Sequence, residues 1–289
     1  MCMSMLCYMD DRFVTENDAK VSVLDLGLLR GFAVFEYVRT YGGTPFLLQE
    51  HLDRFQNSAA ILSLQLPKSL EQIEAIVHEL IERSGLPEAS IKLLATGSIS
   101  EDQFLPTSQT SLILFAYPHK PYPQKWYVEG IHAVIASLTR PLPQCKSTYY
   151  ASAIARLRKT AGARELIYMN DRGVLLEGAT SNLFAVKRGC LYTHMSEEVL
   201  PGITRNFLLR LVQGRFPVEK RGITFWELSE IEELFLTGSN KEIMPVTKIS
   251  FDSDPKELPV GNGRVGPVTI ELMKLFGEKI IENKMSLLL

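Results

Sequence analysis

The sequence predicts an α/β or α+β protein of two domains. Its 289 residues exceed one typical domain and suit two of ordinary size. Short runs with strand character alternate with helical patterns along the chain, as expected for a mixed architecture. The polar segment PHKPYPQKW at 118–126 carries three prolines and is the best linker candidate. We therefore expect domains at 1–118 and 127–289, joined by a linker at 119–126.

The first half contains a hairpin, two helices and two further strands. Two apolar runs, VFEYVRTY and TPFLL, flank a Gly-Gly pair and predict a β-hairpin. Leu52, Phe55, Ala59 and Leu62 follow at helical spacing. The remaining elements expected here are a helix at 70–84 and strands at 90–97 and 111–117.

The second half alternates strands and helices to its end. The elements expected are a strand at 130–138, a helix at 149–163, short strands within 172–193, a helix at 203–213, a strand at 216–219, a short helix at 225–232, a strand at 233–237 and a helix at 267–283. The run GNGRVG at 261–266 matches G-x-G-x-x-G, but it lacks the flanking strands of a dinucleotide site, so we expect a turn.

The composition is that of a globular protein. Hydrophobic residues make up 46% and charged residues 22% of the chain, and the formal net charge is −2. This balance argues against nucleic-acid or membrane-surface binding, and no apolar run reaches the ~18 residues of a spanning helix. The N-terminus is unlike a secretion signal, so we expect a cytoplasmic protein. Cysteines and histidines show no metal-ligand spacing, so we expect no metal site.

The segment 172–205 carries the strongest chemical signal. It places Glu177 inside an apolar strand, turns through small polar residues to Asn182, and ends in GITR at 202–205, which opens a helix. A buried carboxylate needs a cationic partner, because an unpaired buried charge is costly. The free N–H groups at a helix start suit a phosphate. Together they predict a ligand with a protonated ring nitrogen and a phosphate, which pyridoxal 5'-phosphate fits.

Lys146 is the candidate nucleophile. A lysine is most often a solvated surface charge, but in PLPQCKSTYY its neighbours Leu142, Cys145 and two tyrosines offer few polar contacts. A desolvated lysine loses its proton more easily and can form a Schiff base. Tyr149 and Tyr150 follow three and four residues on. On a helix they would share the face of the lysine and could donate to a phenolate oxygen.

Two other places could bind a phosphate. Arg54 follows His51 by three residues on one helix face. It either forms a surface ion pair with Glu50 or Asp53 or clamps a phosphate with its guanidinium fork. The tetrapeptide TGSN at 237–240 follows an apolar strand and is either an ordinary turn or a second phosphate-binding loop.

With these residues collected, the sequence resembles the fold-type IV, class IV pyridoxal-phosphate aminotransferases. That family contains branched-chain aminotransferases, D-amino acid transaminases and 4-amino-4-deoxychorismate lyase. The likeness runs in order through LGLLRGFAVFEYVRTYGGTPFLLQEHLDRFQNSA, Lys146, LLEGATSNLFAV, LPGITR, FLTGSNKEIMPV and GPVT. It implies the two-domain fold of D-amino acid aminotransferase, with a small N-terminal α/β domain and a larger C-terminal pseudo-barrel domain. It also implies a homodimer.

The resemblance implies roles for individual residues. Lys146 is the expected Schiff-base lysine and the base that moves the proton. Glu177 falls on the acid that pairs with the pyridine nitrogen, which makes the cofactor a better electron sink. The other expected cofactor contacts are Arg54, Ile203, Thr204, Ser239 and Asn240 around the phosphate, Leu200 against the ring, and Tyr150 in place of an Asn or Tyr shortly after the lysine.

Four residues are expected to contact the substrate: Arg30, Phe35, Tyr37 and Lys92. Lys92 stands where branched-chain enzymes have an arginine, and Tyr37 where they have a glycine; a lysine is a single-point donor in place of a bidentate fork. The stretch Ala95–Ser98 lacks the arginine with which D-amino acid transaminases grip the substrate carboxylate. The loop at 31–36 reads GFAVFE, whereas family members often read GDGVFE.

We therefore expect an aminotransferase that moves an amino group between a small, branched-chain-like amino acid and a 2-keto acid. Two alternatives use the same cofactor and lysine: a lyase that eliminates pyruvate from aminodeoxychorismate, and a D-amino acid transaminase. An alternative of a different class is a cofactor-binding protein without catalysis, with the altered GFAVFE loop as its signature. Product analysis would separate a lyase, since it needs no keto-acid acceptor.

Overall fold

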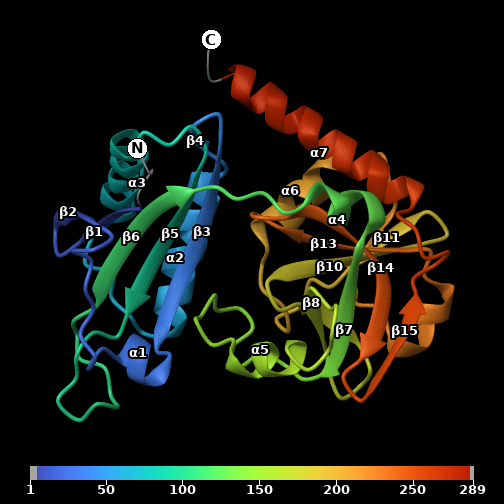
Figure 1. Ribbon diagram of the computed structural model, residues 1–289, viewed down its shortest axis with the longest axis horizontal. Helices are drawn as coiled ribbons and strands as arrows, with labels where there is room; N and C mark the ends of the chain where they lie inside the picture. Colours follow the sequence, from blue (N-terminus) through green and yellow to red (C-terminus); the bar gives the residue numbers. More distant parts are fainter. Residues whose placement is uncertain (1–4, 287–289) are drawn as a thin grey trace. The chain divides into compact units, whose positions relative to one another are not determined.

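The computed structural model describes residues 5–286, which fall into two compact units. One comprises Met1–Lys120 with Cys145–Tyr149, and the other comprises Pro121–Gln144 with Tyr150–Leu289. Both combine helices with a sheet, so the mixed class predicted from the sequence is confirmed (Figure 1). In the part of the chain described, no helix is long and apolar enough to cross a membrane.

The first unit is built on a six-stranded antiparallel sheet in the order β2-β1-β6-β5-β3-β4. Burial alternates along β3: Val34, Glu36 and Val38 are buried, whereas Phe35 and Tyr37 are half-buried. The face that carries the two valines packs against helices α2 and α3. The elements are β1 (Leu6–Met9), β2 (Arg12–Thr15), α1 (Leu26–Arg30), β3 (Ala33–Tyr41), β4 (Thr44–Pro45), α2 (Leu48–Ile61), α3 (Leu70–Ser84), β5 (Ala89–Thr96) and β6 (Ser111–Pro118).

Local sequence explains where α3 begins and ends. The Ser69 hydroxyl accepts from the backbone of Gln72, whose side chain accepts from the Ser69 N–H, forming a capping box. Gly85 ends the helix in the left-handed region at φ +61°. Between these signals, Ile73, Val77 and Leu80 bury one face of the helix in the core. The helix predicted at 70–84 is confirmed.

A later segment completes the edge of β3. The backbone N–H of Phe35 donates to the Lys146 carbonyl at 2.9 Å, and the Thr148 N–H donates to the Ala33 carbonyl at 3.1 Å. Ser147 forms an isolated bridge with Val34 between them. The short β4 pairs only with the far end of β3, so this segment occupies the part of the edge that β4 leaves open.

The second unit is a closed sheet. Strands β10, β13, β14, β7, β8 and β9 pair in that order, and β9 pairs back to β10, which closes a ring; β11, β12 and β15 extend it. Side chains of Ile135, Ile167, Leu183 and Leu236 form part of its core. The strands are β7 (Ile131–Ser137), β8 (Glu165–Met169), β9 (Leu175–Gly178), β10 (Ser181–Lys187), β11 (Cys190–Thr193), β12 (Val218–Glu219), β13 (Glu233–Gly238), β14 (Glu242–Phe251) and β15 (Asp254–Pro259).

Helices of the second unit cover the ring. Phe207 of α6 meets Phe276 of α7 edge-on, with ring centroids 5.4 Å apart. The run GNGRVG is a turn before α7, as predicted, with Gly261 and Gly263 at φ +53° and +75°. The helices are α4 (Gln124–Glu129), α5 (Ala151–Leu157), α6 (Ile203–Leu211), the 3₁₀ helix η1 (Phe225–Glu230) and α7 (Pro267–Ser286).

Two sequence-based expectations for local structure are corrected, and the segment expected as a linker contains parts of two elements. The second arm of the hairpin is only Thr44–Pro45, because Leu47, in the left-handed region at φ +53°, leads the chain into α2. The helix expected at 149–163 is shorter, Ala151–Leu157. The segment at 118–126 includes the last residue of β6 and the first residues of α4, with Pro123 as the helix N-cap, where its fixed φ fits.

Candidate functional site

In the first unit, Lys146 lies beside β3 and its side chain is half-buried. Its backbone N–H donates to the Ser58 hydroxyl of α2 at 3.1 Å. The Nζ atom lies 4.6 Å from the centroid of the Phe35 ring, within cation–π range. The residue is therefore fixed at its backbone from both a helix and a strand, and it places its amine over an aromatic face.

A buried carboxylate lies on the other face of β3. Glu36 is fully buried, and its oxygens accept hydrogen bonds from Arg54 Nη2 at 2.7 and 2.8 Å and from Arg54 Nε at 3.2 Å. His51 Nδ1 lies 2.7 Å from Oε2 and donates to it, because an ionised carboxylate only accepts. Arg54 is therefore not a solvated surface residue, as one of the two expectations had it: it is buried and paired with Glu36.

The charges of this cluster are fixed by their surroundings. Burial alone would raise the pKa of the Glu36 carboxyl, but the adjacent Arg54 and His51, together with Lys146, lower that pKa to about 2. Burial lowers the pKa of His51 more than Glu36 raises it. At neutral pH the cluster therefore holds an ionised Glu36, a cationic Arg54 and a neutral His51.

Three of the four expected substrate contacts share one face of the first sheet. Tyr37 pairs directly with Lys92 across β3 and β5, and Phe35 pairs with Leu94 beside them. The Tyr37 hydroxyl bonds to Ser90 Oγ at 2.8 Å. The fourth expected contact, Arg30, lies at the exposed end of α1, where its Nε donates to the carbonyl of Gln103. The structure thus brings Phe35, Tyr37 and Lys92 together in a row and places Arg30 on a different element.

In the second unit, three polar side chains form a row across the sheet. Asn182 on β10 pairs with Glu177 on β9 and with Thr237 on β13. Directly paired residues of antiparallel strands point to the same face, so the carboxylate, the amide and the hydroxyl lie side by side. The Asn182 amide donates to Glu177 Oε2 at 3.2 Å and to the Leu200 carbonyl at 2.9 Å. We call Glu177, Asn182 and Thr237 the polar row.

Glu177 has the cationic partner that its burial requires. The carboxylate is 2% exposed and accepts from Arg140 Nη1 at 3.1 Å and from the Leu200 N–H at 3.0 Å. Tyr150 is the N-cap of α5 and not within a helix with Lys146, so the shared helical face expected for the lysine and the tyrosines is wrong.

The N-terminus of α6 lies against the polar row. A Cβ on Gly202, the N-cap, would overlap the amide oxygen of Asn182, so only glycine permits this approach. No side chain caps the helix, and no acidic residue lies in its first turn. Ile203 and Thr204 therefore begin the helix with N–H donors and a partial positive charge that suit an anion.

The tetrapeptide 237–240 begins the tight connection between β13 and β14. Gly238 pairs with Glu242, and the Lys241 N–H donates to the Gly238 carbonyl at 3.1 Å. Ser239 is half-buried at the tip, and Asn240 Nδ2 donates to the Tyr122 hydroxyl at 3.0 Å. The Asn240 amide is thus used to hold the loop within the unit.

The residues of the second unit fit pyridoxal phosphate. The buried Thr237 Oγ1 has no hydrogen-bond partner among the described residues, although it lies in the polar row. A buried hydroxyl without a partner is costly and marks a place where a ligand could supply one. A carboxylate that accepts from a ring N–H, an uncapped helix start and a hydroxyl are the groups that a pyridinium phosphate requires. In the first unit, Lys146 supplies a primary amine.

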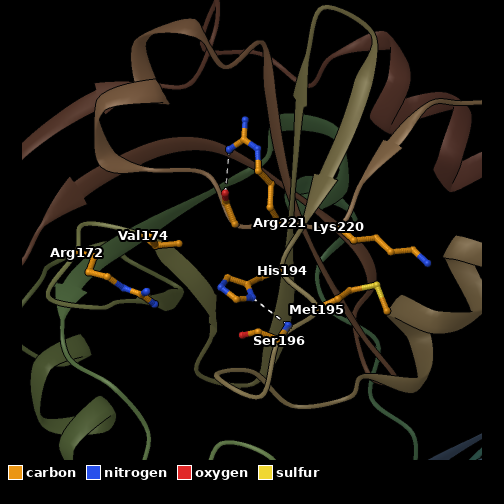
Figure 2. Close-up of a pocket in the computed structure, with 8 residues that line it drawn as sticks. Arg172, Val174, His194, Met195, Ser196, Lys220 and Arg221 are labelled. Atoms are coloured by element: carbon orange, nitrogen blue, oxygen red, sulfur yellow. Dashed lines mark hydrogen bonds between the residues drawn. The ribbon is translucent and has the colours of Figure 1, made fainter.

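One pocket of about 370 Å³ lies elsewhere in the second unit (Figure 2). Arg172, His194, Lys220 and Arg221 are among its lining residues, and none of the expected site residues is. Its arginines are engaged by neighbouring carboxylates, Arg172 with Glu198 and Arg221 with Glu219 and Glu227. The cationic side chains of this pocket are therefore largely neutralised, and it does not coincide with the chemistry above.

Sequence reasoning missed four residues of these arrangements as functional candidates. Glu36 carried a detectable signal, because it stands between Val34 and Val38 at the two-residue spacing of a buried strand face. Thr237 and His51 lay inside recognised motifs without a role. Arg140 had no local signal, since its carboxylate partner lies 37 residues along the chain.

Comparison with known proteins places these arrangements in context. The family model described as amino-transferase class IV matches residues 33–249. A putative branched-chain-amino-acid aminotransferase of Methanocaldococcus jannaschii is 34% identical over 281 residues, covering 94% of this chain and 95% of that protein. A D-alanine aminotransferase of Staphylococcus epidermidis is 29% identical over 284 residues, covering 96% and 98%.

Solved structures have the same fold. The Escherichia coli branched-chain amino acid aminotransferase matches with a TM-score of 0.84 at 29% identity, covering 94% of this chain and 93% of that chain. The Thermoproteus uzoniensis branched-chain aminotransferase with norvaline matches with a TM-score of 0.83 at 30% identity, covering 96% and 95%. A further match, with a TM-score of 0.85 at 28% identity, is a branched-chain amino acid aminotransferase solved with pyridoxamine 5'-phosphate. The predicted fold is confirmed.

Proposed function

The chain belongs to the class IV aminotransferases, and from this premise we propose that it uses pyridoxal phosphate to move an amino group from a branched-chain L-amino acid to a 2-keto acid. The observation that carries the proposal is the polar row with the start of α6 against it. It combines an acid for a ring nitrogen with N–H donors for a phosphate in one unit. Lys146 supplies the amine.

Each residue has a distinct task in this proposal. The cofactor, when bound, supplies an electron sink for the charge left on the substrate carbon. Glu177 holds a proton on the ring nitrogen, and Arg140 and Asn182 keep that carboxylate ionised and oriented. Lys146 Nζ takes the substrate proton and returns it. Before and after that step, the Phe35 ring keeps the amine away from water on one side.

The phosphate is assigned to backbone and side-chain donors. The N–H groups that begin α6 at Ile203 and Thr204 and the hydroxyls of Thr237 and Ser239 would bind it. Arg54 is the further expected phosphate contact. Its guanidinium is oriented by two bonds to Glu36 from the same nitrogen, Nη2, and a third from Nε, so we assign Glu36 the role of fixing that side chain.

Two observations favour an L-amino acid. The Thr96 hydroxyl, in the stretch where D-amino acid transaminases carry an arginine, donates to Asp25 at 2.8 Å. A Cβ on the next residue, Gly97, would lie 2.8 Å from the Phe32 ring, so a long side chain has no room there. The D-alanine aminotransferase relatives keep the D-transaminase as the second candidate.

The Lys146→Ala variant tests the reaction. The wild-type protein should show the visible Schiff-base absorption, and reduction with borohydride followed by peptide mass spectrometry should locate a pyridoxyl phosphate on Lys146. Lys146→Ala should lose this adduct and turnover, while the exposed Lys159→Ala should keep both. Transamination at the normal rate in Lys146→Ala would refute the assignment. A panel of D- and L-amino acids, followed by the cofactor spectrum, identifies the substrate and its hand.

We also propose that the enzyme is a homodimer. Val23, Leu28, Phe104 and Leu105 are 72%, 65%, 68% and 63% exposed. They lie on two segments of the first unit that are held together by the Arg30 to Gln103 bond. Large apolar side chains gathered on a surface mark an interaction site. Light scattering on the eluting protein tests the stoichiometry, and a monomer would refute it.

A further inference from the structure

The second unit contains a buried ion pair that the reaction described above does not use. Glu165 begins β8 and Lys241 ends the loop after β13; they are 2% and 5% exposed. Lys241 Nζ donates to Glu165 Oε2 and also to Thr180 Oγ1 at 2.8 Å. The same carboxylate oxygen accepts from the hydroxyls of Thr180 at 2.8 Å and Ser181 at 3.1 Å.

The pair joins the two structures assigned to the ends of the cofactor. Thr180 lies in the turn between β9, which carries Glu177, and β10, which carries Asn182, and Ser181 is the first residue of β10. Lys241 closes the loop that carries Ser239. The Glu165 carboxylate thus holds the β9–β10 turn and the loop at 237–241, which we call the phosphate loop, to one point on β8.

The backbones around the pair approach each other closely. A Cβ on Gly178, the neighbour of Glu177, would overlap the Ser181 hydroxyl and lie 3.3 Å from Glu165 Cγ. A Cβ on Gly238 would lie 3.3 Å from the Thr180 carbonyl and 3.4 Å from Lys241 Cγ. A shift of the ion pair would therefore be transmitted to the β9–β10 turn through the tight contact at Gly178, and to the loop after β13 through Lys241 itself.

The phosphate loop also needs an external constraint. Glu242, which follows Lys241, has φ +54°, in the left-handed region that side chains other than glycine seldom adopt. Such a conformation persists where the surroundings over-determine it. The buried Lys241 side chain, which enters the core directly before this residue, supplies a fixed point for the loop.

Stability alone does not account for a buried ion pair. Removing two charges from water costs about as much as their attraction returns, and apolar residues of similar size are often as stable. What the pair does provide is a fixed geometry, because Oε1 is also used, by the Leu166 N–H at 3.1 Å. Since the two charges cancel, the pair adds orientation and no net charge.

We propose that Glu165 and Lys241 are positioning residues that set the phosphate loop and the β9–β10 turn at the spacing that pyridoxal phosphate requires. The inference rests on the proposed cofactor and deepens it. Neither residue contacts the reacting atoms. Loss of the pair lets the hydroxyl of Ser239 and the polar row move independently, so it weakens cofactor binding before it affects any chemical step.

The experiment measures binding of pyridoxal phosphate to the full chain freed of cofactor, by calorimetry, together with the melting temperature. Lys241→Met and Glu165→Gln should each weaken binding about 10- to 100-fold, the range known for residues that orient ligand-binding groups from outside. The double variant Glu165→Gln/Lys241→Met leaves no buried charge. It should regain most of the melting temperature but still bind weakly.

Lys187→Met is the matched control. Lys187 lies at the other end of β10 and pairs with Glu227 and Glu230, so the substitution removes an equivalent charge away from the polar row. It should bind the cofactor like the wild type. A double variant that binds the cofactor as tightly as wild type would refute the positioning role. Its binding constant tests the proposal even if the single variants fail to fold. If the wild type itself does not bind pyridoxal phosphate, the proposed function fails instead.

Discussion

The two units treat a buried carboxylate in different ways. Glu36 in the first unit is held across layers: both of its side-chain donors, His51 and Arg54, come from helix α2 above the strand. Glu177 in the second unit is held within the sheet and at its edge, by Asn182 from the next strand, by the Leu200 backbone and by Arg140. The first arrangement ties a helix to a sheet, and the second leaves a row of polar groups along one face.

In the proposal above, Glu36 acts on the ligand only through Arg54, whereas Glu177 would contact the ligand itself. Glu36 meets a guanidinium at two oxygens and an imidazole at one, and it is fully buried. Glu177 stands in a row whose last member, the Thr237 hydroxyl, is buried and has no partner among residues 5–286. Both side-chain donors of Glu36 belong to the protein, whereas Glu177 lies beside a hydroxyl without a partner and an uncapped helix start that a ligand could use.

Replacing each carboxylate by its amide should give the largest measurable difference between the two units. Glu36→Gln leaves Arg54 buried without its anion and should lower the free energy of unfolding by about 3–5 kcal/mol. Glu177→Gln keeps an oxygen for the Asn182 and Leu200 donors, and Arg140 keeps its contact with the Pro143 carbonyl, so it should cost less, about 1–3 kcal/mol. Urea unfolding of the cofactor-free protein measures both.

For binding of pyridoxal phosphate the order should be reversed, with Glu177→Gln more affected than Glu36→Gln. Glu177→Gln should lose the visible absorption of a protonated ring more completely than Glu36→Gln does. Because two units need not unfold together, fluorescence and circular dichroism should both be followed. A greater loss of stability in Glu177→Gln than in Glu36→Gln would contradict the distinction drawn between them.

A single methyl group should test the close approach of α6 to the polar row. Gly202→Ala would push its Cβ into the Asn182 amide oxygen, so it should cost about 1–3 kcal/mol by overpacking and also weaken cofactor binding. Gly277 lies within α7, and a Cβ there meets nothing within 4 Å. Gly277→Ala should instead be neutral or stabilise by up to about 1 kcal/mol. Unchanged stability and binding in Gly202→Ala would show that this approach is not required.

Acid should weaken the first unit in two stages, one between about pH 6.5 and 4 and the other below about pH 4.5. Burial and Arg39 lower the pKa of His119 from 6.5 to about 4, and burial also lowers the pKa of His51. In this range the two histidines are protonated in the unfolded chain but not in the folded unit. The free energy of unfolding therefore falls as the pH drops from about 6.5 toward about 4. Glu36, with a folded pKa of about 2 against 4.5 unfolded, extends the loss below about pH 4.5.

A histidine variant separates these stages. His119→Gln should flatten the dependence of the unfolding free energy on pH between about 6.5 and 4, and leave the loss below about pH 4.5 that Glu36 causes. Urea titrations at a series of pH values measure it. An unaltered slope in this window would mean that His119 does not titrate as its surroundings imply.

Elements with strong periodicity could be predicted from sequence, and those without it could not. The helix at 70–84 and the strand at 111–117 have clear patterns and capping or turn residues, and both are present. Strand β15 was missed because all of its residues are exposed, so no alternation marks it. Strand β14 was missed because Pro245, which lacks an N–H, lies inside it and normally argues against a central strand.

The site divides in the same way. Glu177 was identifiable because a carboxylate among apolar strand residues is rare and costly. The partners of the buried carboxylates come from distant parts of the chain: Arg140 for Glu177, and Lys241 for Glu165, 76 residues apart. Sequence spacing predicts only neighbours on the same helix, so Glu50 and Asp53 were the ion-pair partners expected for Arg54. The pairing with Glu36 depends on how the sheet meets α2, which no local pattern encodes.

The segment Cys145–Tyr149 has a consequence for the order in which the chain can fold during synthesis. A nascent chain that has emerged only as far as Lys120 contains all six strands of the first sheet but not the residues that pair with Ala33 and Phe35. That strand edge stays open until Thr148 leaves the ribosome. The first unit is thus finished only after part of the second has been made, and no single cut of the chain yields both units whole.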